Sequence, residues 1–147
     1  MKSAEIADAV IAAVRGGKHK FLRANFANGD MVGHTGIAPA VRIAVECVDL
    51  ALRRIIPAVR AAEGVLVVTA DHGNADCLFT EKKGKVSTMV AHTLNPVPFI
   101  VKDFSGRNDW GLAGVEDPGL SNVAATLLQL LGYDKPDAYD PSLVKLA

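Results

Sequence analysis

The stretch Val65-Leu-Val-Val-Thr-Ala-Asp71-His72-Gly-Asn74 decides the fold, because an apolar run stops in it at an acid and an imidazole side by side. Five β-prone residues in succession are typical of a parallel strand that is covered on both faces. Ligand sites in open α/β sheets lie beyond the carboxyl ends of such strands. The stretch therefore predicts a buried strand that delivers Asp71 and His72 to a binding site.

Length, charge and cysteine usage narrow the class of protein. The 147 residues suffice for one domain or part of one. Sixteen basic and sixteen acidic residues cancel, which disfavours nucleic acid or an anionic membrane as a partner. Cys47 and Cys77 form neither a disulfide framework nor a CxxC pair, and the sequence shows no signal peptide or membrane-spanning run. We expect a soluble, cytoplasmic protein.

Periodic apolar residues predict helices at residues 3–15, 39–59 and 122–131. Ser3 and Ser121 are expected to cap the first and the last of them. Pro39 suits the first turn of the middle helix, whereas Pro57 predicts a kink or an early end because it removes a hydrogen bond and crowds the preceding turn.

Two further apolar runs, at residues 20–26 and 96–101, predict strands. Residues 81–85 are typical of an exposed turn or hairpin tip, and residues 102–119 are typical of a loop. The residues after Gly132 are expected to form a strap on the surface. Strands that alternate with helices predict an α/β fold, with a parallel or mixed sheet flanked by helices.

Two carboxylates and three imidazoles fall in polar segments next to the predicted strands: Asp30, His34, Asp71, His72 and His92. Oxygen and nitrogen donors without a thiolate suit manganese, zinc or magnesium-like ions. Five ligands exceed the usual three of one catalytic site, so two neighbouring cations are the economical interpretation. Paired metals recur in phosphoryl transfer because they stabilise both the attacking and the leaving oxygen.

Each of these residues also has a structural explanation when it is taken alone. Asp30 suits a turn in Asn-Gly-Asp, His34 suits a satisfied loop histidine, and Asp71 suits a cap after a strand. The five together favour a metal site over these separate explanations.

Four segments of the chain resemble cofactor-independent phosphoglycerate mutases, which belong to the alkaline phosphatase superfamily. They are Asn25-Phe-Ala-Asn-Gly-Asp-Met-Val-Gly-His-Thr-Gly36, Thr69-Ala-Asp-His-Gly-Asn-Ala75, His92-Thr-Leu-Asn-Pro-Val-Pro98 and Gly119-Leu-Ser-Asn-Val-Ala-Ala-Thr-Leu-Leu-Gln-Leu-Leu-Gly132. The order and spacing of the segments agree with that family.

The resemblance implies that residues 1–147 are the C-terminal portion of a metal-dependent, alkaline-phosphatase-like domain. Asp30, His34 and His92 would hold one divalent ion, and Asp71 and His72 the other. Manganese is the expected metal, with cobalt, zinc or magnesium as alternatives, and 2,3-bisphosphoglycerate is not expected as a cofactor.

The complete enzymes of this family interconvert 3-phosphoglycerate and 2-phosphoglycerate in glycolysis through a phosphoserine. Their serine nucleophile, a further aspartate and an inserted transferase domain belong to the family's N-terminal portion, which we expect to be missing here. The resemblance therefore implies an incomplete domain that is inactive alone. Two alternatives stay open: another phosphomutase, phosphonate hydrolase or phosphatase of the same superfamily, and a noncatalytic metal-binding or interaction module.

Overall fold

A computed structural model describes residues 1–107 and 109–146 of the chain. These residues form two compact units, Met1–Phe104 and Ser105–Ala147, and each unit is described by itself. Within the described residues, no helix combines the length and the apolar character that crossing a membrane requires.

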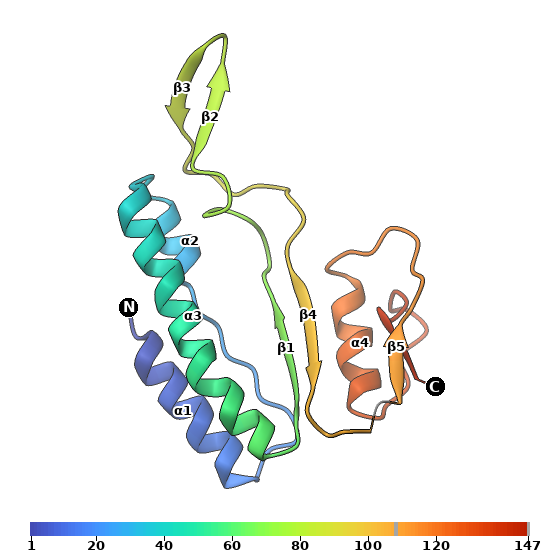
Figure 1. The fold of residues 1–147 in the computed structure, drawn as a ribbon. Coiled ribbons are helices and arrows are strands. Elements are labelled where there is room, and N and C mark those ends of the chain that lie inside the picture. The colour runs from blue at the N-terminus through green and yellow to red at the C-terminus, as the bar shows by residue number, and fades with distance from the viewer. Residues whose placement is uncertain (108, 147) are drawn as a thin grey trace. The chain divides into compact units, whose positions relative to one another are not determined.

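The first unit combines three helices with two pairs of strands, so the α/β class expected from the sequence is confirmed (Figure 1). Its elements, in chain order, are α1 (Ser3–Gly16), α2 (Asn28–Gly33), α3 (Ala38–Ala61), β1 (Val65–Thr69), β2 (Phe79–Lys82), β3 (Lys85–Thr88) and β4 (Phe99–Asp103).

Helices α1 and α3 pack along each other and form the core of this unit (Figure 1). Ala7 of α1 is fully buried, and Ala51 and Ile55 of α3 are nearly so, in one cluster to which Phe26 and Leu66 add partly buried side chains. Small alanine side chains on both helices suit close packing of α1 against α3, and burial of the larger Ile55 side chain adds apolar area removed from water. The core therefore lies between the helix pair and β1.

The helix ends match the sequence predictions only in part. Helix α1 ends at Gly16, one residue after the predicted end, and Gly17 follows it in the left-handed conformation, with φ 62°. The predicted cap at Ser3 is wrong, because Lys2 occupies the N-cap position and Ser3 is already a buried residue of the first helical turn.

Helix α3 begins with Pro39 in its first turn, as predicted, but it continues through Pro57 to Ala61. The predicted early end at Pro57 is wrong. Ile55 and Val59, on either side of the proline, are both buried in the core. Burial on both sides offsets the loss of one backbone hydrogen bond.

Strands β1 and β4 pair antiparallel, with Val67 opposite Val101. The predicted buried parallel strand at 65–70 is therefore wrong in two respects, because β1 is only half-buried and every strand pair among the described residues is antiparallel. The strand predicted at 20–26 is also not found: this segment forms no regular ladder of hydrogen bonds in the structure. A β-prone sequence becomes a strand only where a neighbour pairs with it.

The predicted turn at residues 81–85 is confirmed as the tip of the β2–β3 hairpin. Lys83 and Gly84 form its two-residue loop, and both have positive φ, at 54° and 73°. Such backbone angles match the right-handed twist of the flanking strands. Figure 1 shows this hairpin projecting away from the rest of the first unit.

The second unit contains β5 (Trp110–Leu112), α4 (Asn122–Leu130) and β6 (Val144–Leu146), with β5 and β6 paired antiparallel. Neither of these strands was expected from the sequence. Ser121 occupies the predicted N-cap position of α4, but its side chain makes no capping hydrogen bond. The neighbouring Asn122 side chain instead accepts from the Gly119 N–H and donates to the Pro141 carbonyl, both at 2.7 Å.

Replacing Thr126 with valine is expected to destabilise this unit by about 1–3 kcal/mol. Its fully buried hydroxyl donates to the Asn122 carbonyl and accepts from the Leu143 N–H, both at 2.8 Å. Valine keeps the shape but leaves the Leu143 N–H without its acceptor. Urea denaturation measures the effect, and Thr88→Val in the exposed strand β3 is the control. Equal unfolding midpoints for the two variants would contradict the prediction.

Candidate metal site

Helix α2 places Asp30 and His34 one turn apart. No helix was expected in this polar segment, but the His34 N–H donates to the Asp30 carbonyl at 3.1 Å, which closes a helical turn. Residues four apart lie on the same face of a helix. The carboxylate and the imidazole therefore point in one direction for a reason of helix geometry.

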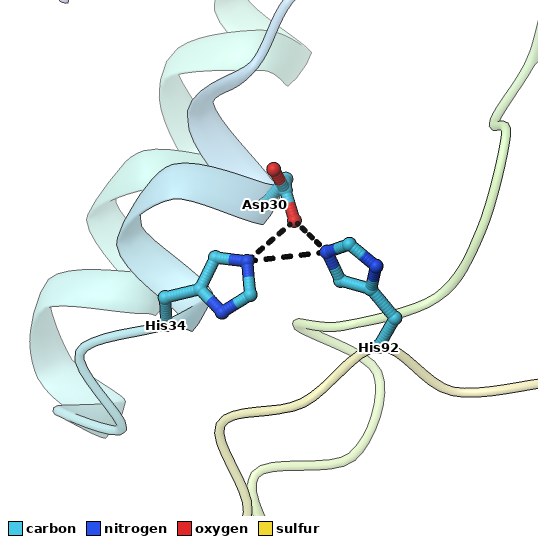
Figure 2. A group of neighbouring side chains, drawn as sticks. All are labelled: Asp30, His34 and His92. Atoms are coloured by element: carbon cyan, nitrogen blue, oxygen red, sulfur yellow. Dashed lines mark hydrogen bonds and ion pairs between the residues drawn. The ribbon is translucent and has the colours of Figure 1, made fainter.

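His92, which follows the β2–β3 hairpin in the chain, completes a compact triad with Asp30 and His34 (Figure 2). The Asp30 Oδ1 atom lies 3.2 Å from His34 Nε2 and 3.0 Å from His92 Nε2. The two Nε2 atoms lie 3.2 Å apart. Ligands around one ion with bonds of about 2.1 Å are separated by about 3 Å, so the spacing of these three atoms fits a shared divalent ion.

The tautomer of His34 strengthens this interpretation. Its Nδ1 lies 2.6 Å from the Val90 carbonyl oxygen, which can only accept a hydrogen bond. The ring proton of neutral His34 is thereby held at Nδ1, and the Nε2 lone pair faces the Asp30 oxygen. Two acceptors at this distance repel each other unless a cation or a proton lies between them. The donor set therefore fits a metal ion.

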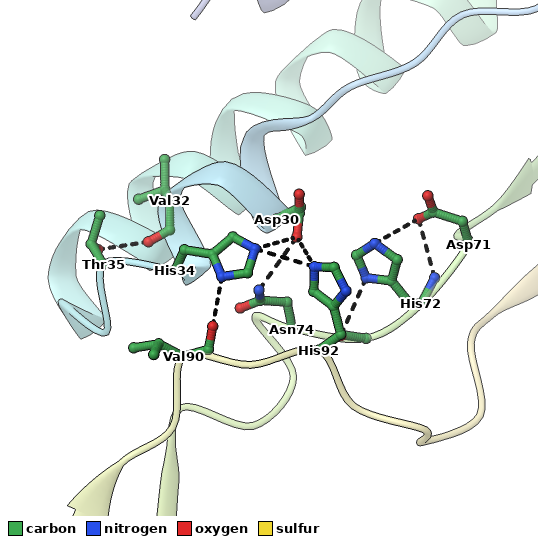
Figure 3. Close-up of polar contacts among 10 residues, drawn as sticks. Asp30, Val32, His34, Thr35, Asp71, His72, Asn74, Val90 and His92 are labelled. Atoms are coloured by element: carbon green, nitrogen blue, oxygen red, sulfur yellow. Dashed lines mark hydrogen bonds and ion pairs between the residues drawn. The ribbon is translucent and has the colours of Figure 1, made fainter.

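Asp71 and His72 lie at the end of β1, as the sequence predicted, but they stand beside the triad rather than in it. Among the described residues, the cluster whose ligand atoms all lie within 4.8 Å of one another contains Asp30, His34 and His92 only. The His72 ring stacks on the His92 ring with centroids 3.7 Å apart. Figure 3 shows His92 between His34 and His72, with Asp71 at the far end.

Asp71 and His72 differ in their exposure to solvent. The Asp71 side chain is 86% exposed and His72 is 27% exposed. Asp71 Oδ1 accepts from the His72 backbone N–H at 3.1 Å and lies 3.7 Å from His72 Nε2. The pair is close enough to contribute to a second ion, and its open side faces solvent. The chain thus brings all five predicted residues into one neighbourhood while only three converge on one point.

A junction that was not expected from the sequence joins the segment after His72 to the segment after His92. The Thr93 N–H donates to the Gly73 carbonyl at 2.8 Å. The Asp76 carboxylate accepts from the buried Thr93 hydroxyl at 3.0 Å and from the Asn95 amide at 2.6 Å. All of these residues lie within or directly beside the quoted motifs, and this position in the sequence was the signal that could have identified them.

The hydrogen bond from Asn95 holds the pKa of Asp76 below its ordinary value, and the Thr93 hydroxyl adds to this effect. A lowered pKa means that the folded state favours the ionised carboxylate. The contribution to stability is therefore present at neutral pH and is lost as the pH falls through the lowered pKa. Asp76 is exposed, so the contribution is small.

Comparison with known proteins assigns the chain that carries this site to a family. Residues 1–135 match the metalloenzyme superfamily. The chain is 40% identical to the 2,3-bisphosphoglycerate-independent phosphoglycerate mutase of Trypanosoma brucei brucei, covering 100% of this chain and 28% of the relative. It is 44% identical to the enzyme of that name from Thermomicrobium roseum, covering 93% of this chain and 26% of the relative.

A solved structure agrees with this match. The crystal structure of Leishmania mexicana phosphoglycerate mutase at low cobalt concentration superposes with a TM-score of 0.94 at 39% identity, covering 100% of this chain and 29% of that one. The chain thus spans less than a third of the length of these relatives. By the match over residues 1–135, it belongs to the metalloenzyme superfamily.

Proposed function

We propose that this chain is the metal-binding part of a cofactor-independent phosphoglycerate mutase, the C-terminal portion of its phosphatase-type domain. The complete enzyme would interconvert 3-phosphoglycerate and 2-phosphoglycerate in glycolysis, without 2,3-bisphosphoglycerate. The observation that carries the proposal is the convergence of Asp30 Oδ1, His34 Nε2 and His92 Nε2 within about 3.2 Å of one another. The relatives that share the fold carry the substrate in their names.

Asp30, His34 and His92 would hold one divalent ion, and Asp71 with His72 would contribute to a second. Such ions supply positive charge that stabilises the oxygens of a transferring phosphoryl group. The protein's own contribution is to fix the donors. The His34 Nδ1–H is committed to the Val90 carbonyl, so only Nε2 is free to bind an ion. The stacked rings of His72 and His92 hold the two halves of the site side by side.

Manganese is the metal that we propose for both sites, since carboxylate and imidazole donors without a thiolate suit it. The related Leishmania mexicana structure was obtained with cobalt, which accepts the same donors. The serine nucleophile and a further carboxylate of the second site would come from outside these 147 residues. We place the protein in the cytoplasm, which its two free cysteines, Cys47 and Cys77, support.

A chimera tests this proposal. The corresponding 28% of the Trypanosoma brucei brucei enzyme is replaced by this chain. We expect the chimera to interconvert the two phosphoglycerates in the presence of Mn²⁺, and the 147-residue chain alone to show no turnover above its His72→Ala variant. Coupled enzymatic assays for both isomers measure the rates.

Two results would contradict the proposal. One is a chimera that folds and binds Mn²⁺ but leaves 3-phosphoglycerate unchanged, which would favour another phosphomutase or a phosphatase of the superfamily. The other is turnover by the isolated chain, which would show that its own residues suffice. The Asp30→Ala chimera is the control, and we expect it to be inactive.

A further inference from the structure

Asn74 lies beneath the metal-binding triad and contacts one of its members directly (Figure 3). Its side chain is almost completely enclosed, with 4% of the residue exposed. The Asn74 Nδ2 donates to Asp30 Oδ1 at 3.3 Å, and this is the oxygen that faces both imidazoles. The amide therefore touches the carboxylate oxygen on which the triad converges.

The other end of the Asn74 amide is unusual. Its Oδ1 atom is buried and has no hydrogen-bond partner among the described residues. A buried polar atom without a partner costs free energy, so packing alone does not favour this placement. The cost is explained if the Asn74 amide occupies this position because its Nδ2 group donates to Asp30.

Gly33 makes room for the amide. A Cβ atom at position 33 would lie 2.1 Å from Asn74 Oδ1, far inside van der Waals contact. Gly29, on the same helix, differs: a Cβ atom there would meet Ala75 Cβ at an ordinary 3.8 Å. Gly33 is the last residue of α2, and the close approach of Asn74 explains why a residue without a Cβ atom occupies this position.

We propose that Asn74 is a positioning residue that orients the Asp30 carboxylate for metal binding, and that Gly33 serves the site by admitting the Asn74 amide. The inference rests on the proposed metal site and goes beyond its ligands. The donor from Asn74 restrains rotation of the carboxylate and leaves the second lone pair of Oδ1 for an ion shared with the Nε2 atoms of His34 and His92. Partners of this kind orient ligands and raise metal affinity.

The test is a pair of substitutions that act on the same amide from its two ends. Asn74→Ala removes the donor, and Gly33→Ala displaces it without removing any polar group. We expect each to lower the Mn²⁺ affinity of the chain by about 10–100-fold. Isothermal titration calorimetry measures the affinity. The visible absorption spectrum of the Co²⁺-loaded chain reports the geometry around the ion, and we expect it to change in both variants.

Gly29→Ala is the matched control, since it adds the same methyl group to the same helix, and we expect its Mn²⁺ affinity and Co²⁺ spectrum to be those of the unsubstituted chain. A purely structural role of Asn74 predicts a lower melting temperature of the metal-free protein with an unaltered Co²⁺ spectrum, which would overturn the inference. So would unchanged affinity in a folded Gly33→Ala variant, even if Asn74→Ala fails to fold. If the unsubstituted chain binds neither ion, the metal site and this inference fail together; if it binds them and both variants bind equally well, only the inference fails.

Discussion

Replacing Asp30 with alanine is expected to lower the affinity of this chain for Mn²⁺ by roughly a hundredfold or more, beyond what the loss of a supporting residue costs. Its Oδ1 atom is the shared neighbour of both imidazole nitrogens, at 3.2 and 3.0 Å. Without this oxygen, two neutral imidazoles are left with no negative charge to offset the ion's charge. Calorimetric titration of the metal-free chain measures the change.

The control for this experiment is Asp49→Ala, which removes an equal charge from an exposed position of α3. We expect its affinity to be that of the unsubstituted chain, because only charge close to an ion contributes strongly in salt solution. His34→Ala should reproduce the Asp30→Ala result. If both triad variants bind Mn²⁺ as tightly as the Asp49→Ala control does, the triad is not a metal site.

Replacing Gly73 with alanine is expected to damage both stability and metal binding. A Cβ atom at this position would lie 2.1 Å from the Thr93 hydroxyl oxygen and 2.5 Å from an Asp76 carboxylate oxygen. The new methyl group must therefore separate the two segments that carry His72 and His92. We expect a loss of about 1–3 kcal/mol in the free energy of unfolding, the usual cost of overpacking, together with a weaker affinity for Mn²⁺.

Gly16→Ala is the control for this substitution, because a Cβ atom there meets nothing within 4 Å. Thermal unfolding of the metal-free chain and calorimetric titration with Mn²⁺ measure the two effects. A Gly73→Ala variant that matches Gly16→Ala in both measurements would mean that the junction yields without cost and does not position the histidines.

The sequence identified the five candidate ligands because each belongs to a short motif with unusual chemistry. The residue pattern alone did not divide them between two ions, and the expected division came from the family resemblance. The local sequence did not indicate that Asp30 and His34 lie on a helical turn, since Asn-Gly-Asp and the glycines around it are typical of loops. Nor could the role of Asn74 be inferred, because its contact with Asp30 spans 44 residues of chain. Local patterns predict residue types for a site, whereas long-range contacts determine which atoms meet.

The errors in the fold have the same origin. Residues 20–26 and the residues of β1 have strand-forming sequences, but whether a strand forms and in which direction it pairs depends on its neighbours. Pro57 illustrates the reverse case, in which a strong local signal for a helix end is overridden by the burial of Ile55 and Val59. Elements fixed by local chemistry, such as the turn at Lys83-Gly84, were predicted correctly.

The separation of the triad along the chain also affects how the protein folds. His34 and His92 are 58 residues apart, yet their Nε2 atoms lie 3.2 Å from each other. Contacts of such high sequence separation form slowly, because the entropy of closing a long loop must be overcome before the contact stabilises anything. We therefore expect the ability to bind a divalent ion to appear late in refolding, after the local helices. As the refolding chain takes up Mn²⁺, the recovery of fluorescence from an indicator that Mn²⁺ quenches would then report arrival at the native state.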